Sequence, residues 1–190
     1  DRTDPSGLQY AVVEAALIGP GLEPDHLERC IRALVARHDA LRVTFSWERE
    51  RPVQRVHEAL EPEISRHARV AGQELPALVD ELVRRPFDLE HGPLFRVLIA
   101  ELEDGRCALM FSAHHAVVDG LSMDIIFREL AILYEDGELQ AAPAVSYPDW
   151  ASWQREQQDG PAGEAGIEHW RSVLRGAPEL LALPWDRRRP

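Results

Sequence analysis

The chain has 190 residues, of which 45% are hydrophobic, and this is enough to bury one sizeable core. It contains no apolar run near the roughly 18 residues of a membrane-spanning helix, and neither a secretory signal nor a start methionine opens it. The formal net charge of −12 argues against a nucleic acid or an anionic membrane surface as partner. We therefore expect a soluble, cytoplasmic piece of a larger protein.

The basic and sulfur-containing residues exclude two kinds of chemistry. All 21 basic residues are arginine, so Schiff-base formation on a lysine is excluded. Cys30 and Cys107 have neither metal-binding nor redox spacing, and we expect both in the core of a protein from a reducing compartment.

The first part of the chain predicts a strand, a helix and a hairpin. A β-rich apolar run from Tyr10 to Ile18 ends at a Gly-Pro-Gly turn. A helix follows from Pro24, and its inner face is formed by Leu27, Ile31, Leu34 and Val35. The next apolar positions alternate, which predicts a strand with one buried face and a partner at residues 53–56; these positions are Leu41, Val43, Phe45 and Trp47.

The middle of the chain predicts a second hairpin. Residues 57–73 are weakly patterned and predict a loop with a short strand near Ile64. A helix stripe follows, made of Leu75, Leu78, Val79 and Leu82. Asp104-Gly105 is a strong turn signal that joins a strand at 94–102 to one at 106–113. The second of these is apolar on both faces, as is typical of a buried central strand.

The most reactive side chains follow this central strand. Residues 113–122 read Ala-His-His-Ala-Val-Val-Asp-Gly-Leu-Ser, so two histidines leave the strand and face the start of a helix. A histidine titrates near neutrality and can take a proton from an attacking amine or alcohol. Asp119 can orient an imidazole or pair with an arginine, and Gly120 lets a slender ligand approach the backbone. Ser122 can cap the helix, whose inner face is Ile126, Leu130 and Leu133.

Two other interpretations of the histidines stay open at this point. Histidine and aspartate are metal ligands, but His114 and His115 are neighbours at a strand end and point to opposite faces, which disfavours a shared ion. A histidine at a strand end is also commonly a core residue with its hydrogen bonds satisfied.

The last part of the chain predicts two helices and a linker. A helix that opens at Tyr147 places Trp150 and Trp153 one turn apart, where aromatic residues are more often core than ligand site. A shorter helix is stopped by Gly176. Residues 186–190 are a charged linker with nothing left to bury.

Five segments together resemble one family. His-His-x-x-x-Asp-Gly at residues 114–120 resembles the signature of the condensation domains of nonribosomal peptide synthetases, which belong to a set of acyltransferases resembling chloramphenicol acetyltransferase. Four more segments match that family in the same order. They are Arg-His-x-x-Leu-Arg-x-x-Phe at 37–45, Pro-Phe-Asp-Leu with Gly-Pro-Leu and Arg at 86–96, Tyr-x-Asp-aromatic-Ala-x-Trp-Gln at 147–154, and Leu-Pro-x-Asp-Arg-x-Arg-Pro at 183–190.

The resemblance implies an α/β fold in which helices cover a mixed, mostly antiparallel sheet. Condensation domains consist of two similar lobes with the reaction tunnel between them, and this chain resembles the N-terminal lobe only, a half of the chloramphenicol acetyltransferase-like fold. We expect residues 1–176 to form that lobe and residues 177–190 to be a linker toward a missing C-terminal lobe.

The implied reaction is amide-bond formation between two thioesters held on carrier proteins. The α-amine of an acceptor aminoacyl thioester attacks a donor acyl or peptidyl thioester. By resemblance the catalytic positions are His114, His115, Asp119 and Gly120. His115 accepts a proton from the amine or orients it, His114 supports the loop, and Gly120 with Ser122 borders the tunnel for the pantetheine arm.

The resemblance also implies a structural ion pair and a set of partners. Asp119 is expected to pair with an arginine of the 37–45 segment, first Arg42 and second Arg37. No cofactor is expected on the chain itself, since 4′-phosphopantetheine arrives on the upstream and downstream peptidyl carrier domains. The other expected partners are the missing C-terminal lobe and adjacent synthetase domains, and without that lobe the chain is expected to be inactive.

Two alternative classes of function remain. The first is a related acyltransferase, namely a starter, ester-forming or epimerisation domain; Leu121-Ser122-Met123 in place of Val-Ser-Trp leans toward condensation over epimerisation. The second is a non-catalytic module that docks a carrier protein.

Overall fold

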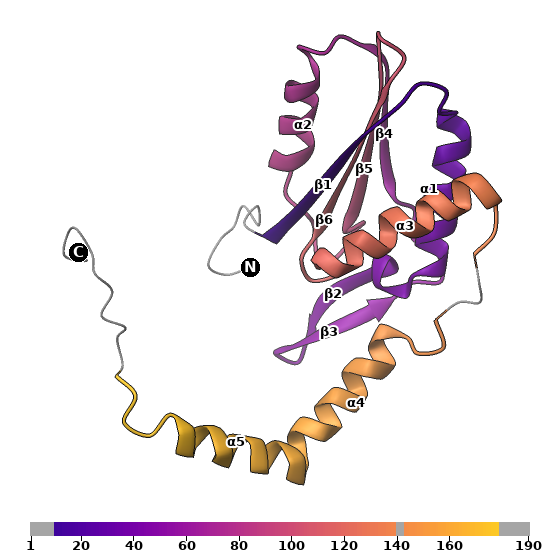
Figure 1. Ribbon diagram of the computed structural model, residues 1–190. Helices are drawn as coiled ribbons and strands as arrows, with labels where there is room; N and C mark the ends of the chain where they lie inside the picture. The colour runs from indigo at the N-terminus through magenta and orange to yellow at the C-terminus, as the bar shows by residue number, and fades with distance from the viewer. Residues whose placement is uncertain (1–9, 140–142, 179–190) are drawn as a thin grey trace, which may run out of the picture. The chain divides into compact units, whose positions relative to one another are not determined.

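The computed structural model describes residues 10–139 and 143–178, and the chain divides into two compact units, residues 1–146 and 147–190. The first unit holds a four-stranded sheet, a two-stranded hairpin and three α-helices, and the second holds two helices (Figure 1). Within the described residues, no helix is long and apolar enough to cross a membrane.

The four-stranded sheet is mixed and mostly antiparallel, which confirms the expected fold class. It consists of β1 (Ala11–Ile18), β6 (Cys107–His114), β5 (Phe95–Leu102) and β4 (Glu63–Val70), in that spatial order. β6 is antiparallel to both β1 and β5, and β4 runs parallel to β5. The predicted central strand is therefore central, with a partner on each side.

Helices cover both faces of this sheet. On one face lie α1 (Pro24–Arg37) and α3 (Gly120–Asp136), and the main core forms between them and the sheet (Figure 1). On the other face lies α2 (Leu75–Arg84), where Leu82 packs with Leu98 and Met110 in a smaller core. The helix stripes predicted for α1 and α3 are buried, because they are the residues that meet the apolar face of the sheet.

The β5–β6 hairpin is the element that positions the histidines. Gly105 in its turn has φ +84°, a left-handed conformation that glycine adopts without strain. Both strands are almost wholly buried, and His114 is the last residue of β6. The predicted hairpin is confirmed to within one residue at each strand end.

Cys30 and Cys107 are both unpaired and buried, as expected of core residues. Burial raises the pKa of both thiols, which keeps them protonated and unreactive near neutral pH.

The hairpin of β2 (Val43–Glu48) and β3 (Arg51–Val56) corrects one expectation. Leu41 lies before the strand in a single 3-10 turn, η2 (Asp39–Arg42), and Trp47 is 72% exposed. The predicted buried face therefore fades along β2. The reason is that these two strands form a two-stranded ribbon separate from the main sheet, so the alternation along β2 is not matched by a packed layer along its whole length (Figure 1).

β4 is longer than the sequence pattern suggested. The short strand expected near Ile64 runs for eight residues and pairs with β5 along its length. The pairing shifts between His67 and Val70, where Arg69 adopts φ +55°, as in a bulge. This irregularity, together with the charged residues of an edge strand, masked the alternation that would have predicted a full strand.

The second unit consists of α4 (Tyr147–Asp159) and α5 (Pro161–Val173). None of its described residues is buried, and Trp150 and Trp153 are 41% and 55% exposed, so their expected place in a core is wrong for this chain. Two helices alone cannot enclose an apolar core. The proposed boundary between a lobe of residues 1–176 and a linker of 177–190 stays a prediction, and residues 179–190 of that linker lie outside the described residues.

Candidate functional site

The two histidines are held where β6 leaves the sheet. The backbone N–H of His114 donates to the carbonyl oxygen of Leu94 at 3.0 Å, and the N–H of His115 donates to that of Tyr10 at 2.7 Å. Strands on both sides thus fix the exit of the chain, and the site rests on rigid elements.

The side chain of His114 is buried and holds the loop that follows it. Its Nδ1 accepts a hydrogen bond from the backbone N–H of Ala116 at 3.1 Å, so its proton resides on Nε2. The rings of Tyr10 and Phe87 are its aromatic neighbours, with centroids 5.9 and 6.0 Å from that of the imidazole. Burial lowers the pKa of His114, which keeps it neutral. This geometry suits a supporting residue.

His115 is exposed, in contrast to its neighbour. Its ring makes no hydrogen bond to any residue that the structure describes. It lies near enough to Asp119 that a positive charge on the imidazole helps to lower the pKa of that carboxyl. An exposed imidazole on a fixed backbone is available to a ligand.

Asp119 begins α3 and forms a capping box with Ser122. Its Oδ1 accepts from the backbone N–H of Ser122 at 2.8 Å and from the hydroxyl at 2.7 Å, while Ser122 Oγ accepts from the backbone N–H of Asp119 at 3.2 Å. These hydrogen bonds are the main cause of the lowered pKa of Asp119. The cap is therefore Asp119, and Ser122, which the sequence suggested as the cap, is its partner at the third helical position.

The two arginines expected to pair with Asp119 have other partners. Arg42 is buried and donates to Asp39 and to the carbonyl oxygens of Val35, His57 and Glu58. Arg37 pairs with Glu129 of α3, 3.1 Å away. The expected ion pairs of Asp119 are therefore wrong in this structure. The physical reason is local: η2 directs Arg42 into the junction of α1 and β3, and the capping box satisfies Asp119.

The space beside Gly120 is open. A Cβ built on Gly120 meets no atom within 4 Å, so nothing in the described chain requires glycine there. Leu121 and Ile125, one turn apart on the same helix, are 74% and 37% exposed. These apolar side chains lie in the first turns of the helix that follows the histidines, where nothing that the structure describes covers them.

No cluster of three or more histidine, cysteine, aspartate or glutamate side chains that could hold a metal ion lies within the described ranges. His114 and His115 indeed differ in environment, one buried and one exposed. The site that the described residues form is thus made of an imidazole, a helix start and open space.

Sequence reasoning gave no role in the site to two residues near His114: Phe87, whose ring meets the imidazole, and Arg96, which lies against the ring of Phe87. Both belong to the segment 86–96, which matches the family pattern but carried no candidate site residue. An available signal was the arginine itself, since Arg96 lies in an otherwise apolar run, and a charge in a buried strand needs a partner.

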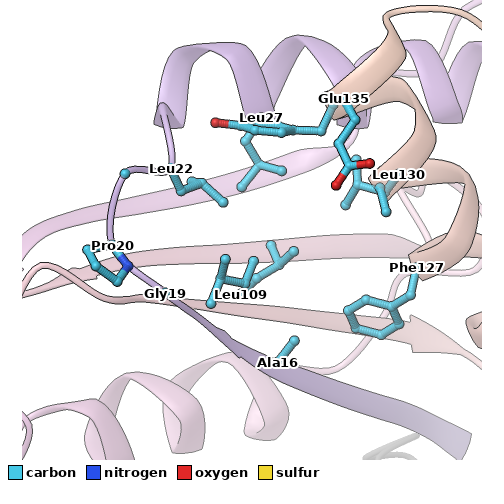
Figure 2. A pocket seen from close by; sticks show the side chains of 13 residues that line it. Ala16, Gly19, Pro20, Leu22, Leu27, Leu109, Phe127, Leu130 and Glu135 are labelled. Carbon is cyan, nitrogen blue, oxygen red and sulfur yellow. The ribbon is translucent and has the colours of Figure 1, made fainter.

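A separate cavity of about 480 Å³ lies at the other end of the sheet (Figure 2). It is bounded by the end of β1, the turn at Gly19–Gly21, the start of α1 and the second half of α3. Its wall is mostly apolar, and Tyr134 and Glu135 also line it. In the antiparallel register, Ile18 of its wall pairs with Cys107 whereas Ala11 pairs with His114, so the cavity lies away from the histidines.

Comparison with known proteins relates this chain to one family. The model of the family described as "Condensation domain" matches residues 3–190. Gramicidin S synthase 2 of Brevibacillus brevis is 35% identical over 190 residues, which is all of this chain and 4% of that protein. Phosphinothricin tripeptide synthetase PhsB of Streptomyces viridochromogenes is 36% identical over 208 residues, which is all of this chain and 17% of that protein. The chain thus spans a small part of the length of these relatives.

A solved structure agrees with the sequence comparison. The X-domain complex with OxyB from teicoplanin biosynthesis superposes with a TM-score of 0.82 at 28% identity. The match covers 95% of this chain and 42% of that chain, so the fold described above corresponds to less than half of the solved one.

Proposed function

Because the chain belongs to the condensation-domain family, we propose that it is the N-terminal half of a domain that forms amide bonds in nonribosomal peptide synthesis. A donor acyl or peptidyl thioester on one carrier domain is attacked by the α-amine of an aminoacyl thioester on another. The sulfur leaves with the electron pair of the C–S bond, and the ammonium proton is lost to a base or to water. Both pantetheine arms belong to the carrier domains.

The observation that carries this proposal is the contrast between the two histidines. His115 is exposed on a backbone fixed by Tyr10, whereas His114 is buried and neutral. In the proposed reaction His115 contacts the attacking amine and accepts its proton or orients it, and His114 holds the loop. Holding two thioesters together supplies further acceleration, since proximity is worth about 7–11 kcal/mol in well-oriented reactions.

The open surface beside Gly120 supports the second half of the proposal. Leu121 and Ile125 present apolar area next to the site, and the solved X-domain chain is more than twice as long as the region matched here. We propose that the remainder of the domain covers this surface, completes the tunnel and excludes water. The chain alone then lacks one wall and is inactive.

The experiment is to measure the intact mass of carrier-bound product. Donor-loaded and acceptor-loaded carrier domains are mixed with this chain and, in parallel, with the longer protein that completes the domain. We expect the condensed product only with the longer protein. Product from the chain alone would contradict the need for a second half. Epimerisation does not change the mass, so the released donor is also analysed by chiral chromatography. An ester in place of the amide would identify a related acyltransferase, an inverted donor an epimerase, and carrier that is bound but unreacted a docking module.

A further inference from the structure

The buried arginine of β5 occupies an unusual position. Arg96 is only 6% exposed, in a strand whose neighbouring residues are apolar. In the sheet it lies in register with Glu63 of β4 and Ser112 of β6, on the α2 face that also carries His114 two residues after Ser112. A buried charge is costly unless it is paired and hydrogen-bonded, so its contacts must account for its presence.

Those contacts bind one short segment. Nη1 of Arg96 donates to the carbonyl oxygen of Arg85 at 2.6 Å, and Nη2 donates to that of Pro86 at 2.7 Å. Its Nε lies 3.3 Å from Oε2 of Glu63, within ion-pair distance but without the alignment of a hydrogen bond. Glu63 also pairs with the side chain of Arg85, so the carboxylate joins both arginines. A planar guanidinium that binds two successive carbonyls fixes a segment in position as well as in orientation.

The next residue of that segment reaches the histidine. The guanidinium carbon of Arg96 lies 4.0 Å from the ring centroid of Phe87, a cation–π contact. The ring of Phe87 meets the imidazole of His114 nearly edge-on, at 88° and 6.0 Å. His114 in turn accepts the N–H of Ala116, the residue that follows His115. A continuous line of contacts thus runs from Arg96 through Phe87 and His114 to the loop.

We propose that Arg96 is a positioning residue, which holds Phe87 against His114 and thereby fixes the loop that presents His115. Its importance for the reaction rests on the proposed function, but its action on His114 does not. An apolar residue in β5 would pack beneath the segment without fixing the two carbonyls, and the ring of Phe87 would then have no fixed place.

The test is nuclear magnetic resonance of the histidine rings in the chain as it exists, which needs no turnover. The signals of His114 are assigned with His114→Asn, and its titration and tautomer are followed in wild type and in Arg96→Met and Phe87→Ala. We expect both variants to move the midpoint of His114 upward, toward the ordinary value of about 6.5, and to mix its tautomers. If Arg96 acts through Phe87, the double variant shifts the midpoint no further than the larger single shift.

Three controls separate positioning from general loss of structure. Phe87→Tyr keeps the ring and should leave the midpoint of His114 unchanged, and Arg96→Lys, which keeps the charge but not the fork, should restore it only in part. Arg42→Met removes another buried arginine that donates to backbone carbonyls and should lower stability without moving His114. If Arg96→Met does not fold, the test rests on Phe87→Ala.

The outcomes are separable from those of the proposed function. Two results would overturn the positioning role of Arg96, whether or not the domain forms amides. One is an unchanged titration midpoint of His114 in folded Phe87→Ala, and the other is a double variant in which the two single midpoint shifts add. If the shifts occur, the completed domain should lose at least about tenfold in rate with Arg96→Met and regain part of it with Arg96→Lys. If the midpoint of His114 shifts in Arg96→Met but the completed domain reacts at the wild-type rate, Arg96 has no role in the reaction.

Discussion

His114 is buried and His115 is exposed because β6 ends between them. The pleat directs His114 onto the α2 face, where Phe87 covers it, and His115 follows beyond the last ladder position and stays exposed. The alternation of side chains along a strand does not by itself tell which histidine is buried, because burial depends on Phe87 and Tyr10, which are distant in the chain. The family resemblance was needed to expect His114 as the supporting residue.

Replacement of His114 should change how stability depends on pH. Burial lowers the pKa of His114 in the folded state, so below about pH 6.5 the unfolded chain binds a proton that the folded chain does not, and acid destabilises the fold. His114→Asn keeps an acceptor for Ala116 and cannot titrate in this range. Its free energy of unfolding should fall less between pH 7.5 and 5.5 than that of wild type, as measured by urea denaturation at each pH. An equal loss of unfolding free energy in the two proteins over this pH range would contradict a buried, neutral His114.

Removal of the Asp119 carboxylate should weaken the start of α3. Asp119→Ala removes the acceptor for Ser122 and is expected to cost about 1 kcal/mol, whereas Asp119→Asn should lose only a fraction of that. The lowered pKa implies that this contribution is present at neutral pH and is lost as the pH falls below about 4. Equal unfolding midpoints for wild type and Asp119→Ala at pH 7 would show that the capping box contributes nothing.

The long-range partners of charged residues could not be predicted from the sequence. Arg42 and Asp119 belong to two matching segments, and the family resemblance suggested that they pair. In the structure Arg42 finds an acid three residues away and several carbonyls, and Asp119 finds Ser122. Local hydrogen bonds were available to both, and no pattern in the sequence reveals which option a folded chain takes.

Elements with a strong local signal were predictable. The hairpin of β5 and β6 follows from Asp104-Gly105 between two apolar runs, and the buried faces of α1 and α3 follow from helical spacing. The burial of one face of β2 was not predictable. Alternation indicates which side chains share a face, but it does not indicate whether another element covers that face. Trp47 occupies the correct face of a ribbon that has no cover.

The turn between β2 and β3 offers a stabilising change. Arg49 and Glu50 both have positive φ, at 48° and 64°, the pattern of a two-residue hairpin turn that favours Asn-Gly. Replacing Arg49 by Asn and Glu50 by Gly should relieve this strain and raise the free energy of unfolding by about 1 kcal/mol. Thermal or urea unfolding measures the gain in stability. Arg175→Asn and Glu138→Gly make the same two changes at exposed positions outside this turn, and they should give no such gain.

At the scale of the whole molecule, stability resides in the first unit. Every described buried side chain lies before residue 140, and none lies in α4 or α5. A chain that ends at Ser146 should therefore unfold cooperatively, with a midpoint within a few degrees of the full chain. A loss of cooperativity in calorimetry would show that the helices of the second unit stabilise the first.

The cavity near Gly19 is a second feature of the whole fold. Ala16 points into this space from β1, and Leu109 and Phe127 line it (Figure 2). Ala16→Val adds two methyl groups in a strand and should stabilise the chain by about 1 kcal/mol if the cavity has room for them. A destabilised Ala16→Val would show that the wall collapses inward or is already filled; Ala15→Val, at the neighbouring exposed position, is the matched control.

The most direct measurement of the central claim is the rate of amide formation by the completed domain with His115 replaced by alanine. An exposed side chain of this kind can be removed without unfolding, so we expect an unchanged unfolding midpoint and a rate lower by about 10²- to 10⁴-fold, the range typical of general acid–base groups. A rate within twofold of wild type in the folded variant would contradict the assignment of His115, and with it the account of how β6 and α3 build the site.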